Sequence, residues 1–396
     1  MMQNTASSGI LTTQFWLLGL SSFLFSSSFN MLIPELPAYL SSMGGAEYKG
    51  AIIGLFTLTA GLSRPFSGRL TDRVGRVPVM AFGSLVCFVC GFLYPIFTTV
   101  MPFLLLRLVH GFSTGFKPTG TAAYVADIVP INRRGEAMGI HGMCMSVGSA
   151  FGPAIGSMIS QEFSLNALFY TSSLLAFLSI AILLNMKETL QEKQKLSLKS
   201  FQITRRDIFE PDVFSPALIT FLCYFGFGAV ATVTPDFSGY LGLQNRGLYF
   251  MMFTISSIMV RLFAGKISDR HGRMPVTIVG CIVLIIAMII TGFAESVFMF
   301  LTGAAFFGIA MGILSPVLSA WTVDLSGDHN RGRAIATMFI SLEAGIGLGA
   351  FLSAELFENQ RENLPLVFFC MAAFALAALS YTVVIYQFKK RRARVI

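Results

Sequence analysis

Long apolar segments recur along the whole chain, and they restrict its fold more than any other feature. Each has about 20 residues, enough to cross roughly 30 Å of hydrocarbon as a helix. Only 12% of the residues are charged and 54% are hydrophobic, so the chain lacks the polar surface of a soluble fold. The twelve segments lie near residues 14–39, 49–69, 79–97, 102–126, 137–158, 165–186, 215–241, 247–268, 275–294, 298–323, 333–354 and 364–387. The sequence therefore predicts an all-α membrane protein with twelve transmembrane helices.

The basic residues are distributed unevenly over the loops. If the N-terminus is cytoplasmic, almost all of them fall on that side, and only Lys49, Arg246 and Arg361 fall outside. This bias predicts that both termini are cytoplasmic. The first segment lacks the basic start and cleavage site of a signal peptide, so we expect it to be a retained helix. We expect a multi-pass protein of the plasma membrane, which in a bacterium would be the inner membrane.

The charge and the cysteines argue against several function classes. The net charge of +8 is spread over cytoplasmic loops that face anionic lipid heads, so we expect no nucleic-acid partner. The pair Cys87 and Cys90 lies in an apolar segment without the further ligands of a zinc site. No Walker loop or HExxH motif is present in the sequence. We expect no metal, no cofactor and no use of ATP.

The second half of the sequence repeats the first. At an offset of 197 residues Arg64 aligns with Arg261, and Pro78 with Pro275. The register holds over about 90 residues, which chance does not produce. We predict two pseudo-symmetric six-helix bundles, residues 1–186 and 214–396, the second with a basic cytoplasmic tail. The polar stretch 187–213 is predicted to be a cytoplasmic linker. Such repeats are typical of alternating-access transporters with a site between the halves.

Three motifs carry a resemblance to a known family. "GRLTDRVGR" after the second segment resembles the signature loop of the major facilitator superfamily, "RLVHGFSTG" its arginine motif, and "GSAFGPAIG" the motif of its twelve-helix drug:proton antiporters. His110, and Ser157 after the last motif, depart from the family pattern. The resemblance implies a secondary transporter that works by alternating access, commonly as a monomer. It also implies that the first, fourth, seventh and tenth helices line a central cavity.

The repeated charged loops are predicted to act as gates. Asp72 and Asp269 are placed to cap the following helix, and Arg76 and Arg273 to pair with Asp127 and Asp324. We expect these pairs to hold the cytoplasmic side shut in the outward-facing state and to break when the halves rock. The predicted gating residues are Gly68, Asp72, Arg73, Gly75, Arg76, Asp127, Gly265, Asp269, Arg270, Gly272, Arg273 and Asp324.

Polar residues form a stripe along the fourth segment at helical spacing. At the same offset the second half has an apolar stripe. If the stripe lines the central cavity, as the resemblance implies, one wall is cationic and the other apolar, which favours an amphiphile with an anionic or acceptor-rich end. The predicted cavity residues are Asn30, His110, Thr114, Lys117, Tyr224 and Met311. The alternatives are helix packing for Asn30 and Tyr224, and snorkelling toward the interface for Lys117.

Glu343 is the one acid near the middle of a predicted helix. A carboxyl that titrates at this depth is what proton coupling requires. The alternative is a neutral or salt-bridged carboxyl that holds this helix to its neighbours. The resemblance links Arg107 to proton coupling, and Arg107 is placed to act on a nearby carboxyl. Arg64 and Arg261 are expected to be interfacial anchors.

Glycines in the fifth segment predict close helix packing. Gly148, Gly152 and Gly156 allow a second helix to approach, and Pro153 introduces a kink. In the resemblance this motif marks exporters.

The function expected is a proton-coupled exporter of amphiphilic small organic molecules, with protons, the substrate and the lipid bilayer as partners. The alternatives are a proton-coupled importer of an organic anion, which Arg107 and Lys117 favour, and a lipid flippase or a sensor with the same fold. An enzyme is not expected, because no catalytic set can be placed on facing positions.

Overall fold

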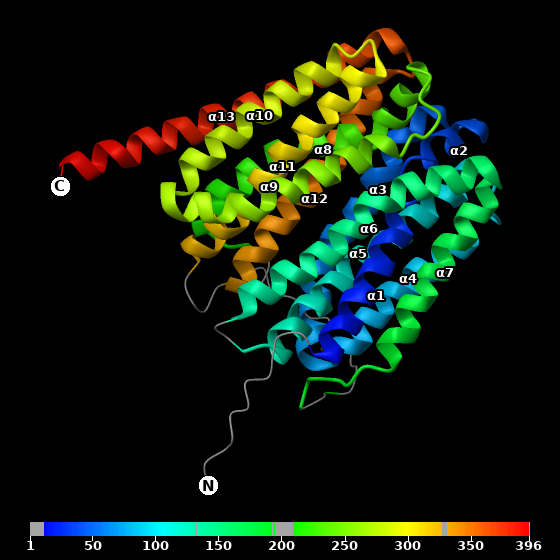
Figure 1. The fold of residues 1–396 in the computed structure, drawn as a ribbon, viewed down its shortest axis with the longest axis horizontal. Coiled ribbons are helices and arrows are strands. Elements are labelled where there is room, and N and C mark those ends of the chain that lie inside the picture. The colour runs from blue at the N-terminus through cyan, green and yellow to red at the C-terminus, as the bar shows by residue number, and fades with distance from the viewer. Residues whose placement is uncertain (1–11, 131–132, 192–193, 195–208, 327–330, 396) are drawn as a thin grey trace.

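The computed structural model describes all residues except 1–11, 131–132, 192–193, 195–208, 327–330 and 396. The described chain is helical and contains no strand (Figure 1). Its α-helices are α1 (Thr13–Asn30), α2 (Leu36–Ser42), α3 (Lys49–Arg73), α4 (Arg76–Leu93), α5 (Val100–Ile128), α6 (Arg134–Glu162), α7 (Leu165–Leu184), α8 (Phe214–Tyr240), α9 (Leu248–His271), α10 (Arg273–Gly292), α11 (Val297–Leu325), α12 (Arg331–Phe357) and α13 (Leu364–Val395). The expected all-α fold class is confirmed.

The helices form two bundles that repeat the same packing. In the first bundle α1 packs on α6 and α7, α5 on α3 and α4, and α4 on α7. In the second bundle α8 packs on α12 and α13, α11 on α9 and α10, and α10 on α13. Figure 1 shows the two bundles side by side, joined where α3 meets α12 and α6 meets α9. The repeat seen in the sequence is thus a repeat of helix contacts.

The expected number of membrane-spanning helices is not confirmed. In the part of the chain that the structure describes, eight helices are long and apolar enough to span, or nine if Leu248–Arg261 and Phe263–His271, bent by 47°, form one span. The helices α1, α3 and α5 fall short because they carry polar side chains into the protein. Buried serines on α1, for example, are Ser21, Ser22, Ser26, Ser27 and Ser28.

The first apolar segment is also shorter as a helix than expected. It divides into α1, which ends at Asn30, and α2, which begins at Leu36. Pro34 lies in the turn between them and has no backbone N–H to continue the helix, and Pro37 occupies the first turn of α2.

The glycines of α6 allow the close approach that the sequence predicts. A Cβ atom on Gly156 would lie 2.2 Å from the carbonyl oxygen of Met31, and one on Gly148 2.7 Å from that of Phe23. Gly152 faces Ser27 in the same contact, so α6 lies directly against the backbone of α1. Pro153 lies inside α6 and touches Gly247 of the other bundle.

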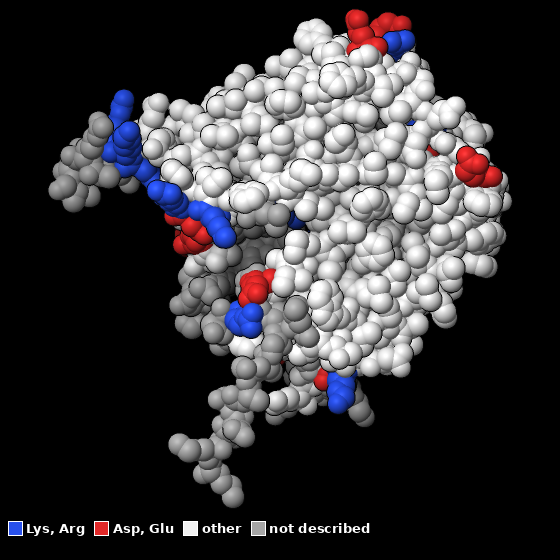
Figure 2. Space-filling model, viewed as in Figure 1, with Lys and Arg blue, Asp and Glu red and all other residues white. Residues whose placement is uncertain are grey.

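Exposed charged side chains avoid the middle of the surface. On the face shown in Figure 2 they gather at the two ends, with an uncharged band between them. We call the end that carries residues 68–76, 265–273 and 187–191 the linker end, and the opposite one the far end. An apolar band between polar ends is what a bilayer requires of a multi-pass protein.

Candidate functional site

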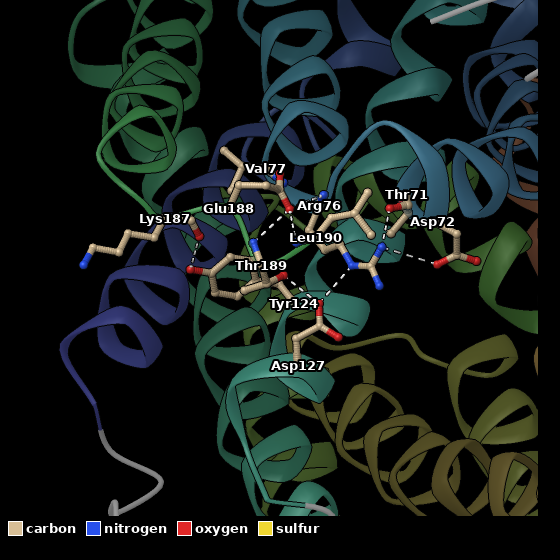
Figure 3. A network of polar contacts seen from close by, with 10 residues as sticks. All are labelled: Thr71, Asp72, Arg76, Val77, Tyr124, Asp127, Lys187, Glu188, Thr189 and Leu190. Carbon is tan, nitrogen blue, oxygen red and sulfur yellow. Dashed lines mark hydrogen bonds and ion pairs between the residues drawn. The ribbon is translucent and has the colours of Figure 1, made fainter. Parts of the chain in front are cut away.

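Arg76 connects the first charged loop, residues 68–76, to α5 (Figure 3). Arg76, the first residue of α4, donates from Nε to Asp127 of α5 over 2.9 Å and from Nη1 to the carbonyl of Thr71 over 2.6 Å. Gly75 has a φ of +139°, a conformation that side chains with a Cβ rarely adopt, so this turn requires glycine. The pairing expected between Arg76 and Asp127 is present.

Glu188, not Asp72, caps α4. The Glu188 carboxylate accepts from the backbone N–H groups of Arg76 and Val77, each over 3.0 Å, and the neighbouring Thr189 hydroxyl donates to Asp127 over 2.6 Å (Figure 3). Asp72 is exposed and lies 3.6 Å from Arg76. The expected cap by Asp72 is therefore wrong. The cap comes from the linker because the negative charge of Glu188 sits at the positive end of α4.

The second loop repeats the arginine but not the cap. Arg273 donates from Nε to Asp324 over 2.7 Å and from Nη1 to Asp269 over 2.5 Å. Gly272, with a φ of +90°, precedes α10, and among the described residues no side chain caps the start of this helix, so the expected cap by Asp269 is also wrong.

Both ion pairs lie within one bundle. Arg76 and Asp127 join α4 to α5, and Arg273 and Asp324 join α10 to α11. Neither pair bridges the halves, and both are formed in this conformation. That they latch the linker end shut and break when the halves rock stays a prediction. The other loop residues make fewer contacts: a Cβ on Gly68 or Gly265 would meet nothing within 4 Å, Arg73 is half-buried and Arg270 is exposed.

Ion pairs at the far end do bridge the halves. Lys49 of α3 lies 2.7 Å from Asp236 of α8, and Glu35 lies 3.4 Å from Arg246. Further hydrogen bonds across this end run from Asn245 to Ala154, from Gln161 to Gln244 and from Asn359 to Ala46. This closure was not predicted from the sequence. The signal for it was that Lys49 and Arg246 are exceptions to the one-sided distribution of basic residues.

The polar stripe of α5 faces the inside of the first bundle. Arg107 is buried and donates to the carbonyl of Ile52 over 3.0 Å and to the Tyr94 hydroxyl over 3.2 Å, with its guanidinium over the Phe56 ring. His110, fully buried, lies 3.0 Å from the same tyrosine hydroxyl. No carboxylate is among the partners of Arg107 in the described chain, so its expected action on a nearby carboxyl is not seen here.

Lys117 also points into the first bundle. Its Nζ donates to the carbonyl and hydroxyl of Ser21, over 3.0 and 2.8 Å, and to the hydroxyl of Ser179, and it lies over the ring of Phe25. Ser21 belongs to α1 and Ser179 to α7. The amine is therefore neither snorkelling to an interface nor lining a cavity in this conformation.

The remaining cavity candidates are packed as well. Asn30 donates to the carbonyl of Ser26 and to the hydroxyl of Ser149, which ties α1 to α6. Thr114 bonds the carbonyl of Gly111 on its own helix, and Tyr224 and Met311 are buried in the core of the second bundle. Packing, the alternative for Asn30 and Tyr224, describes their contacts in this conformation.

Glu343 is paired, and its partner comes from the other half. Arg64 of α3 donates from Nη2 to Glu343 of α12 over 2.8 Å, and the two side chains are 12% and 9% exposed. The expectation that Arg64 is an interfacial anchor is therefore wrong. Gly61, midway along α3, lies against the Cβ of Glu343, so the pair sits near the middle of the molecule.

A groove of about 710 Å³ lies beside this ion pair, between α3 and α12. It is lined by leucines, phenylalanines and glycines of both helices, and Glu343 is the one charged residue that lines it. In the part of the chain that the structure describes, no cluster of three or more His, Cys, Asp or Glu side chains is placed to hold a metal ion.

Comparison with known proteins identifies the family. The model of the Major Facilitator Superfamily matches residues 18–290 and 216–395. Multidrug resistance protein 2 of Bacillus subtilis strain 168 is 26% identical over 317 residues, 76% of this chain and 78% of the relative. The quinolone resistance protein NorA of Staphylococcus aureus strain MRSA252 is 23% identical over 365 residues, 88% and 91% of the two chains. The crystal structure of a D-xylose-proton symporter superposes with a TM-score of 0.75 at 16% identity, covering 93% and 96%. The chain belongs to the major facilitator superfamily of transporters, as its signature loop and repeated bundles indicate.

Proposed function

We propose that this transporter is a proton-coupled exporter of amphiphilic small organic molecules. The observation that carries the proposal is the ion pair between Arg64 and Glu343, which is buried and joins the two halves. Relatives named for multidrug and quinolone resistance support the export of organic compounds.

The ion pair offers a physical route to coupling. In the present conformation Arg64 donates a hydrogen bond to the Glu343 carboxylate and places a positive charge beside it. When the halves rock about the level of Gly61, the pair separates. A carboxylate left without its cation in an apolar environment binds a proton instead. Proton binding on one side of the membrane and return of Arg64 on the other would drive the cycle.

The ion pairs at the far end form the gate that closes in this conformation. Opening that end requires Lys49 to leave Asp236 and Arg246 to leave Glu35. Since the basic loops favour a cytoplasmic linker end, the far end is the outer one, and the conformation seen is closed to the outside. The protein acts as a monomer in the plasma membrane, because each polypeptide supplies both halves of the gate.

Export is tested by untargeted mass spectrometry of medium and cell contents, with efflux-deficient bacteria that express the wild type or Glu343→Gln, which lacks the proposed coupling carboxylate, at equal protein levels. Compounds enriched in the medium only with the wild type are expected. Enrichment inside the cells would indicate the organic-anion importer instead. No difference in either compartment would contradict export and favour a flippase or sensor.

A further inference from the structure

The last helix is longer than a membrane span requires, and its end leaves the second bundle. Helix α13 has 32 residues, whereas about 20 cross the hydrocarbon. Each residue from Gln387 to Arg391 is exposed. Five successive residues cover every side of a helix, so no described helix packs against α13 at this level. Figure 1 shows this end of α13 projecting beyond the other helices of the bundle. We call residues 387–395 the projecting end.

The projecting end begins at the depth of the lipid headgroups. Arg361 and Glu362 come just before α13, so the apolar part of the helix begins at Leu364. From Leu364 to Lys389 an α-helix rises about 38 Å, and the hydrocarbon core is about 30 Å thick. Lys389 and the residues that follow it therefore lie just outside the hydrocarbon, where the phosphate groups of the lipids are.

The charges of the projecting end all have one sign. Residues 389–394 read KKRRAR, which is five basic residues and no acid. Lys389, Lys390 and Arg391 are exposed, and in the described chain none of them pairs with a carboxylate. Figure 2 shows basic side chains in a row along this edge of the molecule. Such a cluster next to a membrane span attracts anionic headgroups, and an arginine can bind a phosphate through two parallel hydrogen bonds.

One face of α13 combines this charge with apolar side chains. Val384, Gln387, Phe388 and Arg391 are spaced by three or four residues, so they share a face, and they line a shallow hollow of about 120 Å³. Val384 is 49% exposed and Phe388 64%. Both precede Arg391 along the helix and lie nearer the membrane. The hollow therefore offers apolar contact toward the membrane and a guanidinium away from it.

We propose that the projecting end of α13 binds an anionic phospholipid, with the phosphate on Arg391 and the two lysines and an acyl chain against Val384 and Phe388. The exposed apolar side chains favour a lipid over a soluble acidic partner, which would leave them without contact. Since α8 and α10 pack on α13, the bound lipid holds the second bundle at one depth in the bilayer. The inference depends on neither the substrate nor the direction of transport.

The test is native mass spectrometry of the purified full-length protein, released from nanodiscs of phosphatidylcholine that contain a minor fraction of phosphatidylglycerol. The ratio of the two lipids that stay bound is compared with their ratio in the nanodisc. We expect the wild type to retain phosphatidylglycerol in excess. The triple variant Lys389→Gln, Lys390→Gln and Arg391→Gln should lower that excess at least about tenfold, because each basic residue near the surface adds to the attraction.

A matched variant separates the site from the overall charge. Arg134→Gln, Lys187→Gln and Lys266→Gln together remove the same charge from exposed positions at the linker end, and the excess should persist. Phe388→Gln keeps every charge and removes the apolar side of the hollow, so the excess should fall several-fold. All these side chains are exposed, and the thermal midpoint, measured in parallel, is expected to stay the same in each variant.

Three results would overturn the proposal. Retention of the two lipids by the wild type in their nanodisc ratio would show that the basic residues serve only to orient the helix. An equal loss in the triple variant and in its matched control would indicate a general effect of charge. An unchanged excess in Phe388→Gln would indicate diffuse attraction to the headgroups rather than a lipid in the hollow.

Discussion

The contact between Gly247 and Pro153 tests whether the far end opens during the cycle. A Cβ atom on Gly247 would lie 2.2 Å from the carbonyl carbon and oxygen of Pro153, in the other half, where ordinary contact begins near 3.4 Å. Gly247→Ala therefore forces the two backbones apart by about 1 Å in the closed conformation and in that one alone. Overpacking of this kind costs about 1–3 kcal/mol, which shifts a two-state equilibrium about 5- to 150-fold toward the conformation that is open at the far end.

The shift is measured as a distance distribution between spin labels. Asn166→Cys and Glu362→Cys place labels on exposed positions of the two halves at the far end, in a background without the six native cysteines. Double electron–electron resonance should show a longer distance gaining population in Gly247→Ala. Gly239→Ala is the matched control, because a Cβ there meets nothing within 4 Å. Identical distributions for all three proteins would refute the reasoning.

Three further predictions concern the charged groups. Glu188→Ala removes the cap of α4 and should lower the free energy of unfolding by about 1 kcal/mol, read from thermal unfolding in detergent; an unchanged midpoint would contradict the cap. Lys117→Met should leave the range of exported compounds unchanged and the thermal midpoint unchanged or higher, because the hydroxyls of Ser21 and Ser179 can bond to each other; an altered substrate preference would support a cavity role for Lys117. Lys49→Asp should reduce export by opening the far end, and adding Asp236→Lys should recover it; failure of the double variant to recover export would argue against an ion-pair gate.

The repeat explains which site contacts were predictable from sequence. Arg76 and Asp127 align with Arg273 and Asp324 at one offset, so a pairing in one half implied the same pairing in the other. The repeat carries no information on Glu188, which lies outside the repeated part of the sequence; in the part of the chain that the structure describes, no side chain caps α10 in the same way.

Contacts between the halves were out of reach of the sequence. Arg64 and Glu343 are 279 residues apart and do not correspond under the repeat, so nothing in the sequence pattern connected them.

The polar stripe of α5 was predicted in part. Helical spacing places Arg107, His110 and Lys117 on one face and indicates that this face meets protein or water. The spacing does not tell whether this face lines the central cavity between the bundles or packs inside one bundle.

The hydropathy pattern predicts the all-α fold, but it also predicts twelve similar apolar spans, and fewer of the described helices are that apolar. The serines of α1 and the cations of α5 are buried in the first bundle, where they bond to neighbouring helices. Such helices need less apolar surface than those that face lipid on most sides.

Proton release on addition of substrate tests the central claim most directly. Inside-out membrane vesicles are acidified by their own respiration, and an exported compound identified by mass spectrometry is added while lumenal pH is followed with a fluorescent amine. The account predicts rapid alkalinisation with the wild type and none with Glu343→Gln at equal protein level. Alkalinisation of the same rate in Glu343→Gln would show that the pair between Arg64 and Glu343 does not couple protons to transport.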